Sequence, residues 1–339
     1  MTNADRVITI AVDAMGGDHA PQELVAGAVA AARDGGVQIA LVGDEEKVRH
    51  ELSRHEADGL PISVVPSEGV IEEGEQPALA LRQKPRSSIL VCTGLVKKSL
   101  ADATVTMGST GAAMAASAVV LGMFDGIDRP ALGGPVLGVA PHTTIIDLGT
   151  NVDCRPAQLL SFGVIGGVFA SSFWGIENPR IALLSVGGEA GKGNRQVREA
   201  TALFEKSGLN FVGNVEANDL PMGKVDVAVT DGFVGNIVMK LTEGLGAALS
   251  ERLRQRLQGK LPESEIEELV RDVYEINNVV ETHGGGPLLG VNGVCVVGHG
   301  RGKAESVRRA IGTARHSVES ALVERLEVEL AAVQAKVGA

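Results

Sequence analysis

Residues 7–33 have the sequence VITIAVDAMGGDHAPQELVAGAVAAAR, and this stretch sets a pattern that the rest of the chain repeats. It opens with a short apolar run, Val7–Val12. A turn rich in Gly and Asp follows, and then Gln22–Arg33, which has the composition of a helix. The apolar run does not alternate with polar residues, which is typical of a strand buried on both faces. The stretch therefore predicts a buried strand, a glycine-rich turn and a covering helix.

The same order recurs along the chain, and the fold class follows from this repetition. Helices are predicted at Glu45–His55, Gly111–Met123 and Asn194–Lys206. Strands that alternate with helices indicate a mostly parallel sheet covered on both sides. We therefore expect an α/β fold, a three-layer α/β/α sandwich, formed as a single domain over residues 1–339. The further strands are predicted at Val37–Val42, Ile62–Val65, Ser88–Cys92, Ala103–Thr106, Thr143–Asp147, Arg180–Val186, Val225–Thr230 and Val294–Val297.

The composition is that of a packed globular protein in a reducing compartment. Hydrophobic residues make up 44% of the chain and charged residues 22%, a balance typical of such proteins. The net charge of -11 argues against a protein that grips nucleic acid by neutralising its phosphates. Three scattered cysteines, Cys92, Cys154 and Cys295, predict neither a disulfide framework nor a zinc site. We expect a cytoplasmic location.

Two uncharged runs, residues 103–124 and 156–176, are long enough to be considered as membrane spans. A span needs ~20 predominantly apolar residues, and both runs contain several Gly and Ser. We interpret the first as a strand, a turn and a buried helix, and the second as a buried core helix. The apolar run at Val7–Val12 is too short for a signal peptide, so we expect no leader.

Residues 244–282 break the alternation and predict a protruding αα-hairpin. Leucines recur every four residues, Gly259–Pro262 makes a turn, and a second apolar series follows at helical spacing. An apolar stripe on each arm needs a cover, which intramolecular packing or a dimer partner would supply. Nearby cations leave a peripheral membrane contact open as well. One further helix is expected over Lys303–Ala335. The apolar series are Leu245, Leu249, Leu253 and Leu257, then Ile266, Leu269, Val270, Val273 and Ile276; the cations are Arg252, Arg254, Arg256 and Lys260.

Turns rich in Gly, Asn, Asp and Lys follow many of the predicted strands. In a parallel sheet ligands bind beyond the carboxyl ends of the strands, so these turns are the candidate site. Glycine turns that lead into helices expose N–H groups and a positive dipole end, which favour an anion. Lys192 and Lys303 add charge, although neither turn is a Walker A loop. Together the turns predict a phosphate or a phosphorylated ligand. They cover residues 13–21, 107–111, 148–154, 187–194, 231–236 and 298–303.

The sequences of these turns and their order along the chain resemble those of the phosphate acyltransferase family of bacterial phospholipid synthesis. The matching motifs are DAMGGDHAP, GIDRPAL, NVDC, a KGN turn, GKVDVAVTDGFVGN and GGGPLLGVNG, and they span about residues 7–314. The resemblance implies an isocitrate-dehydrogenase-like fold, a homodimer and, in some members, peripheral membrane association. It also implies that an acyl group passes from acyl carrier protein to inorganic phosphate, and that the acyl phosphate then serves a glycerol-3-phosphate acyltransferase.

The sequence departs from the family pattern at several turns. Ser109 stands where the family usually has Asn, and Thr150 stands where it usually has a small Ala. The turn before KGN has the sequence GGEAG, with fewer acidic residues than usual. The swaps are mostly polar for polar, so we expect them to affect the phosphate contacts and the rate more than the reaction.

Attack of phosphate on a thioester mainly requires positioning and stabilisation of an oxyanion, so no metal and no organic cofactor is expected. His19 is the candidate for proton transfer, with Asp13 and Asp18 near enough in sequence to orient it. Lys192 is the candidate phosphate clamp. Asp231 is expected to hold Lys192 or His19 electrostatically, or alternatively to cap a helix.

The remaining candidate residues are polar or glycine positions in the same turns. They are Asp13, Gly16, Gly17, Ser109, Thr110, Gly111, Asn151, Asn194 and Asn236, all expected to bind substrate. Cys154 invites a covalent acyl-enzyme hypothesis, but no histidine accompanies it in sequence, so we favour a small packing residue. His299 is a weaker candidate, whereas His50 and His55 are expected to be solvated.

Acyl carrier protein is acidic, so a basic docking face is expected. The candidate faces are the cluster Arg82, Lys84 and Arg86, the pair Lys97 and Lys98, and the helix segment 252–256. Three other functions remain as alternatives: a short-chain acyl-coenzyme A phosphotransacylase, a nicotinamide-dependent decarboxylating dehydrogenase, and a carrier-protein-binding scaffold without catalysis. The dehydrogenase would need a metal-binding carboxylate cluster.

Overall fold

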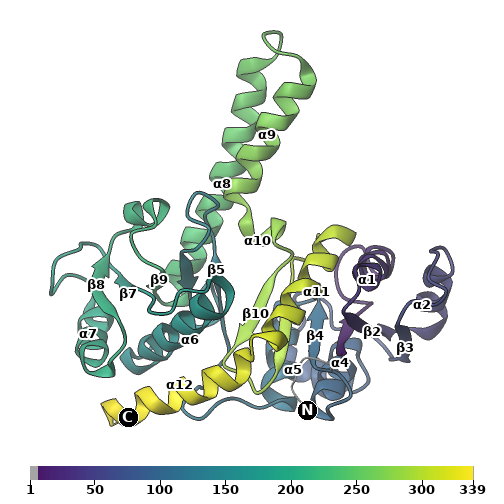
Figure 1. The fold of residues 1–339 in the computed structure, drawn as a ribbon, viewed down its shortest axis with the longest axis horizontal. Helices are drawn as coiled ribbons and strands as arrows, with labels where there is room; N and C mark the ends of the chain where they lie inside the picture. The colour runs from purple at the N-terminus through teal and green to yellow at the C-terminus, as the bar shows by residue number, and fades with distance from the viewer. Residues whose placement is uncertain (1–6, 339) are drawn as a thin grey trace. The chain divides into compact units, whose positions relative to one another are not determined.

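The computed structural model describes residues 7–338 and divides the chain into two compact units. Unit 1 consists of Met1–Pro130 and His283–Glu324, and unit 2 of Ala131–Thr282 and Arg325–Ala339. Each unit is an α/β sandwich with its own set of strands (Figure 1). The expectation of a single domain over residues 1–339 stays a prediction.

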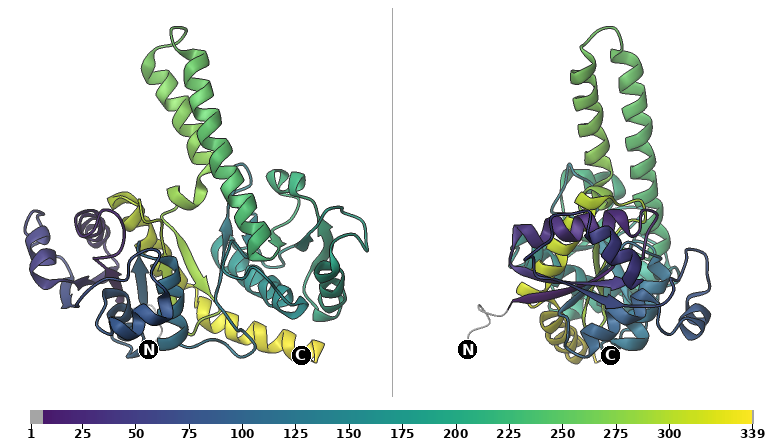
Figure 2. Two further views of the ribbon diagram at one scale, coloured as in Figure 1. Left: turned by 180° about the vertical axis from the view of Figure 1, so that it is seen from behind. Right: turned by 90° about the vertical axis from the view of Figure 1, so that its right-hand side faces the viewer.

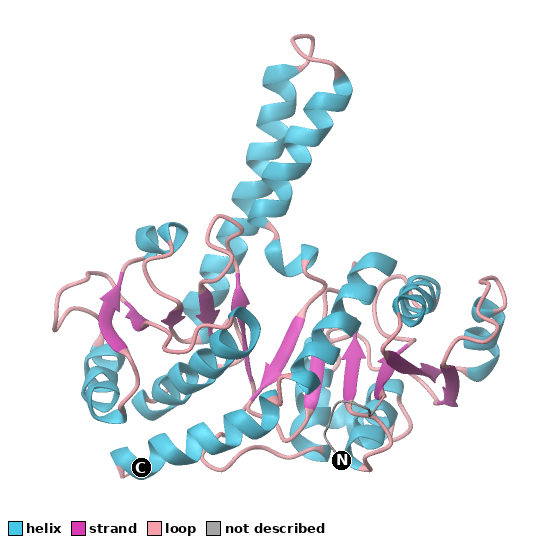
Figure 3. Cartoon of the chain, viewed as in Figure 1, coloured by secondary structure: helices cyan, strands magenta, loops and turns pink. Residues whose placement is uncertain are grey.

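Unit 1 is built on strands in the order β3-β2-β1-β4-β11-β10. All neighbouring pairs are parallel except β10 and β11, which are antiparallel (Figure 3). Successive residues of β1 point to opposite faces: Ile10 and Val12 join one core cluster, and Ala11 joins another. The strands are β1 (Ile8–Asp13), β2 (Val37–Gly43), β3 (Ile62–Pro66), β4 (Ala103–Thr106), β10 (Gly286–Leu289) and β11 (Val294–Val297).

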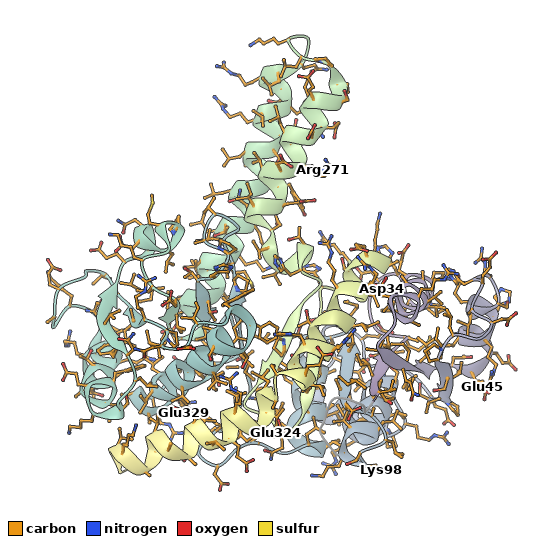
Figure 4. All side chains as sticks on the ribbon, viewed as in Figure 1. Asp34, Glu45, Lys98, Arg271, Glu324 and Glu329 are labelled. Carbon is orange, nitrogen blue, oxygen red and sulfur yellow. The ribbon has the colours of Figure 1, made fainter. Side chains whose placement is uncertain are left out.

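Helices cover both faces of the unit 1 sheet. On one face α1 and α11 pack against each other and on the strands, with α2 beside them. Asp34, labelled in Figure 4, ends α1 and accepts a 2.7 Å hydrogen bond from Arg308 of α11. On the other face lie α4 and α5, with α3 against α5. The helices are α1 (Gln22–Asp34), α2 (Glu45–Leu52), α3 (Pro77–Gln83), α4 (Ser88–Lys97), α5 (Thr110–Val120) and α11 (Ala304–Glu319).

Unit 2 has strands in the order β5-β6-β9-β7-β8. The strands β6, β9, β7 and β8 are mutually parallel, and β5 runs antiparallel to β6. The parallel order brings the carboxyl ends of β6, β9 and β7 to one edge of the sheet, where the candidate turns follow. The strands are β5 (Ala131–Pro135), β6 (Thr144–Ile146), β7 (Ile181–Leu184), β8 (Phe211–Val215) and β9 (Val227–Val229).

One face of the unit 2 sheet is covered by α6 (Pro156–Trp174) and α7 (Arg195–Ser207). Among the described residues α6 is the one helix long and apolar enough to cross a membrane, and 61% of its apolar window is buried. Its glycines allow the helix backbone to approach the strands. This burial favours the interpretation of α6 as a core helix. The opposite face is covered by α8 (Gly232–Leu257), whose Val234 and Val238 pack on the strand residues, and by a short 3₁₀ helix at Ala217–Met222.

The predicted hairpin is present in unit 2, although its first arm begins earlier than expected. α8 starts at Gly232, runs for 26 residues and is followed by α9 (Glu263–Asn277) and α10 (Val279–Thr282). α8 and α9 lie side by side and extend beyond the sheet of their unit (Figure 2). Gly246 allows the close approach, because a Cβ there would lie 2.5 Å from the Cβ of Asn277. The buried contact includes Ile266 and Val270 of α9.

Some element predictions were wrong. Ser88–Cys92 begins helix α4 and is not a strand: the buried residues Ser88, Ile89, Cys92 and Thr93 have helical spacing, and periodicity alone does not separate a short apolar run of either kind. The expected final helix is two helices, α11 and α12 (Leu322–Val337), separated at Ala321, whose φ is +50°. Strands β5, β8 and β10 were not predicted, and their Gly and Pro residues explain why.

Gly166 of α6 should be intolerant of a side chain. A Cβ there would lie 2.5 Å from Val227 of β9 and 3.2 Å from Ile146 of β6. We expect Gly166→Val to lower the free energy of unfolding by about 1–3 kcal/mol through overpacking, measured by urea denaturation. The matched control is Gly244→Ala, since a Cβ on Gly244 of α8 would have no neighbouring atom within 4 Å. The control should be neutral or slightly stabilising. Equal stability of the Gly166 variant and the wild type would contradict the packing.

Candidate active site

In unit 1 the turns after β1, β4 and β11 meet, as predicted for neighbouring parallel strands. The Asp18 N–H donates to the Gly300 carbonyl at 2.8 Å. A Cβ on Gly16 would lie 2.8 Å from the Gly108 nitrogen, and a Cβ on Gly17, whose φ is +103°, would lie 3.0 Å from the Met107 carbonyl oxygen. Glycine is required at both positions, because the backbones of the turns touch there.

Asp13 is buried and connects the turns after β1 and β4. Its Oδ2 accepts a 2.8 Å hydrogen bond from Thr106 Oγ1, and its Oδ1 accepts one from the Met15 N–H at 3.1 Å. Thr106 Oγ1 in turn accepts from the Gly108 N–H at 3.0 Å. Burial raises the pKa of Asp13, and the hydroxyls of Ser88 and Thr106 partly oppose that rise. Its role toward substrate stays a prediction, and the observed contacts are with the turn itself.

The other predicted ligand-binding residues of unit 1 lie in the turns after β1 and β4. Ser109 caps α5 by accepting from the Ala112 N–H at 3.4 Å, and Thr110 and Gly111 form the first turn of that helix. His19 is exposed at the end of the β1 turn. Within residues 7–338 no hydrogen bond joins His19 to Asp13 or Asp18, so the expected orientation by these carboxylates is not seen.

Sequence reasoning did not single out Arg301, which lies in the turn after β11. Its side chain is exposed, and it directly follows Gly300, whose carbonyl accepts from the Asp18 N–H. Arginine is suited to phosphate because its N–H groups bind two oxygens at once. The sequence signal for Arg301 is its place in residues 298–303, a glycine-rich turn that also contains Lys303.

In unit 2 the turn after β6 is wrapped around Asp147, which no motif had singled out. The side chain is fully buried and accepts hydrogen bonds from the N–H groups of Leu132, Gly149, Thr150 and Asn151 at 2.7–3.3 Å. It also accepts from Thr150 Oγ1 at 2.7 Å and from Asn151 Nδ2 at 2.9 Å. The signal in sequence was an Asp at the end of a buried strand, shortly before a Gly-Thr-Asn turn.

Asn151 is therefore buried, and its amide Nδ2 donates to Asp147 and, at 2.7 Å, to Thr150 Oγ1. The Asn151 carbonyl accepts from the Gly232 N–H at 2.7 Å, which joins this turn to the start of α8. A direct contact of Asn151 with substrate stays a prediction. In this conformation both N–H groups of the Asn151 side-chain amide donate hydrogen bonds within the turn, to Asp147 and to Thr150.

Asp231 and Asn236 lie at the first turns of α8. Asp231 is the N-cap, and its Oδ1 accepts from the Val234 N–H at 2.8 Å. This is the capping alternative that the sequence left open. Asn236 is exposed and stands beside Gly149, whose φ is +139°. A Cβ on Gly149 would lie 3.4 Å from the Asn236 Oδ1.

Lys192 and Asn194 lie in the turn between β7 and α7. Asn194 caps α7 by accepting from the Val197 N–H at 2.9 Å. The Asn214 amide donates to the carbonyls of Glu189 and Lys192 and so closes the turn. The side chain of Lys192 is exposed, and within the described residues its ammonium forms no ion pair. A free cation beside a helix N-terminus is a suitable electrostatic partner for an anion.

Cys154 follows the turn after β6, and its environment disfavours a nucleophile. Its Sγ donates to the Asn151 carbonyl at 3.2 Å. Burial, with smaller contributions from the charges of Asp147 and Asp231, raises the pKa of Cys154 to about 12. The thiol is therefore protonated at neutral pH. Among the described residues no group of three His, Cys, Asp or Glu side chains is arranged to hold a metal ion.

Comparison with known proteins agrees with this architecture. The sequence pattern of the family described as "Fatty acid synthesis protein" matches residues 8–325. A phosphate acyltransferase from Pelotomaculum thermopropionicum is 46% identical over 331 residues, covering 96% of each chain. A phosphotransacetylase from Streptococcus pyogenes has the same fold, with a TM-score of 0.63, 21% identity and coverage of 92% and 94%. So does 4-hydroxythreonine-4-phosphate dehydrogenase from Klebsiella pneumoniae, with a TM-score of 0.52, 17% identity and coverage of 94% and 99%.

The fold is that of an α/β/α enzyme, and the relatives named phosphate acyltransferase place the chain in the acyltransferase class. Within that class, the chain belongs to the phosphate acyltransferase family. The expected fold, of the kind shared with dehydrogenases and phosphotransacylases, is confirmed.

The raised pKa makes a direct prediction about the reactivity of Cys154. At pH 8 the thiol of the folded chain stays protonated, whereas in the unfolded chain a pKa of ~8.5 leaves much of it ionised. Iodoacetamide should therefore label Cys154 roughly 100-fold or more slowly in the folded chain than in urea, as followed by peptide mass spectrometry. Equal rates in the two states would contradict the raised pKa, and faster labelling of the folded chain would show that the thiol is activated and would restore the covalent acyl-enzyme hypothesis.

Proposed function

We propose that this enzyme transfers a fatty acyl group from acyl carrier protein to inorganic phosphate and releases an acyl phosphate for glycerophospholipid synthesis. The observation that carries the proposal is the meeting of the glycine turns after β1, β4 and β11 at the N-terminus of α5, beside the exposed His19. Backbone N–H groups and a helix N-terminus at one edge of a sheet suit a small anion. The curated relatives named phosphate acyltransferase support the same reaction.

In the proposed reaction a phosphate oxygen attacks the thioester carbonyl carbon. The carbon–sulfur bond breaks, the thiolate leaves on the carrier protein, and the new carbon–oxygen bond gives the acyl phosphate. Phosphate is already a nucleophile at neutral pH, so the protein has to position it and stabilise the oxyanion. His19 takes the proton from phosphate or supplies one to the thiolate. Lys192, in the turn between β7 and α7 of unit 2, stays the candidate for binding the negative charge of phosphate.

A short-chain acyl-coenzyme A phosphotransacylase is the second candidate. It is favoured by the shared fold with the Streptococcus pyogenes protein named phosphotransacetylase. The two functions differ in the thioester that they accept. Parallel assays with palmitoyl-acyl carrier protein and with acetyl-coenzyme A therefore separate them.

Thiol release is the measurement that tests the function. Phosphate should be required for release of the carrier-protein thiol from palmitoyl-acyl carrier protein. We expect His19→Gln to lower kcat roughly 100-fold or more, as for loss of a general acid–base group. Lys192→Ala should mainly raise the KM for phosphate. The controls are His50→Gln on α2 and Lys206→Ala on α7, which are exposed residues outside the turns. If no thioester is cleaved, the proposal fails and the carrier-protein-binding scaffold becomes the favoured alternative.

The proposed reaction requires a basic surface on this protein to which the acidic acyl carrier protein docks. Several cations of the candidate clusters already have partners: Lys84 pairs with Glu75, Arg86 with Glu68, and Arg254 with Glu267. The first two pairs reduce the positive field of the 82–86 cluster, and the third reduces that of the segment 252–256. The adjacent Lys97 and Lys98 at the end of α4 are the face that we favour in unit 1 (Figure 4, Lys98).

We also propose that the protein is a cytoplasmic homodimer and that α8 supplies the dimer contact. Large apolar side chains recur every four residues on this helix and are 48–60% exposed: Phe233, Ile237, Leu241, Leu245 and Leu249. A contiguous exposed stripe of this kind is typical of an interface. A membrane surface is the alternative partner of the stripe. The cations Arg252 and Arg256, which follow the stripe on α8, suit anionic lipid.

Charge placed on the stripe should distinguish these occupants. Leu241→Glu should convert a dimer into a monomer, as measured by light scattering after size-exclusion chromatography, because a buried unpaired carboxylate is costly. Ala247→Glu, at an exposed position of α8 outside the stripe, is the control that adds the same charge without touching the stripe. Sedimentation with anionic vesicles is measured on both variants. If the wild type is a monomer, and if it binds vesicles while Leu241→Glu does not, the stripe contacts a membrane and the dimer proposal is wrong.

A further inference from the structure

The turn after β6 has the geometry of an anion nest that the chain fills with its own carboxylate. Successive N–H groups of Gly149, Thr150 and Asn151 point to one place, as they do in sites that cradle phosphate. That place is taken by the buried Asp147 side chain. The nest is therefore satisfied from within, and an external phosphate would have to displace a covalently attached, fully buried carboxylate.

Thr150 reinforces this arrangement through its side chain. The hydroxyl donates to Asp147 Oδ2 at 2.7 Å and accepts from Asn151 Nδ2, also at 2.7 Å. One hydroxyl thus connects the carboxylate to the amide, and the amide donates to the carboxylate as well. Hydrogen bonds to a charged group are stronger than those between neutral groups, so the three side chains form a rigid unit.

The same unit is attached to the beginning of α8. The Gly232 N–H donates to the Asn151 carbonyl at 2.7 Å, and the Asp147 N–H donates to the Thr230 carbonyl at 3.0 Å. Gly232 and Gly235 present bare backbone to the turn, because a Cβ on Gly235 would collide with the Asp147 carbonyl oxygen. Asn236, one residue further along α8, then stands beside Gly149 and is exposed.

We propose that Asp147 and Thr150 are positioning residues: they lock the turn at residues 149–151 onto the first turns of α8 and so fix the Asn236 amide where it contacts substrate. The inference rests on the proposed function for the role of Asn236. Asn151 then helps to hold the turn in place, and the exposed amide of Asn236 is the group that contacts substrate. The turn itself binds no phosphate.

Thr150→Val tests the lock without changing the size of the side chain, and Thr150→Ser is the matched control because it keeps the hydroxyl. We expect Thr150→Val to lower kcat/KM roughly tenfold, as for loss of a hydrogen bond to a charged group, and Thr150→Ser to retain the wild-type value within about twofold. Asp147→Asn should have a larger effect, and Thr150→Val remains informative if that variant fails to fold.

A double-mutant cycle with Asn236→Ala separates positioning from general destabilisation. If the lock acts through Asn236, the combined loss in kcat/KM of Thr150→Val with Asn236→Ala is smaller than the product of the single losses. Independent effects that multiply would overturn the proposal. So would a Thr150→Val variant with wild-type kcat/KM.

Amide hydrogen exchange provides a readout that does not depend on activity. Exchange of the Gly232 N–H should be several-fold faster in Thr150→Val than in Thr150→Ser or the wild type, since its acceptor on Asn151 is less firmly held. Unchanged exchange would show that no lock exists. Inactivity of the wild-type chain toward every thioester would refute the proposed function, and the exchange result would still decide whether the lock is real.

Discussion

In each unit, the candidate turns depend on a buried carboxylate at the end of a central strand. Asp13 ends β1 in unit 1, and Asp147 follows β6 in unit 2. A carboxylate removed from water must be surrounded by donors, and the nearest donors are the N–H groups and hydroxyls of the turn that follows. Each turn is thereby folded back onto its own strand, and the glycines within it allow the backbones to touch.

This arrangement has an electrostatic consequence for an enzyme that handles phosphate. The two buried aspartates lie in a chain that already has a net charge of -11. Burial raises the pKa of Asp13, and the donors around Asp147 distribute the charge of its carboxylate but do not cancel it. The exposed cations at the turns, Arg301 and Lys303 in unit 1 and Lys192 in unit 2, are well placed to provide the attraction that an anion needs.

Much of the fold could be predicted from the sequence, because buried strands and glycine turns have clear local signals. The strand of Val37–Val42 and the helix of Gln22–Arg33 follow from composition and period alone. The strand β10, with the sequence GPLL, has no such signal, since its pairing with β11 is set by tertiary contact. The site was predictable as a set of turns. What each side chain does there was not, because the sequence does not reveal that the Asn151 amide points inward to Asp147, or that Asp231 caps α8.

The order in which the segments of unit 1 occur along the chain affects how it is made. β4 pairs with β11, whose residues 294–297 follow the whole of the hairpin in sequence, and the covering helix α11 comes later still. On a ribosome, the first five helices and four strands emerge with one edge of β4 unpaired and one face of the sheet incompletely covered. Residues 131–282 are then synthesised before the missing pieces arrive. Unit 2 has a similar dependence on α12, whose buried leucines are almost the last part of the chain to appear. Neither unit is complete as a continuous fragment, so folding during synthesis has to wait for the carboxyl-terminal residues.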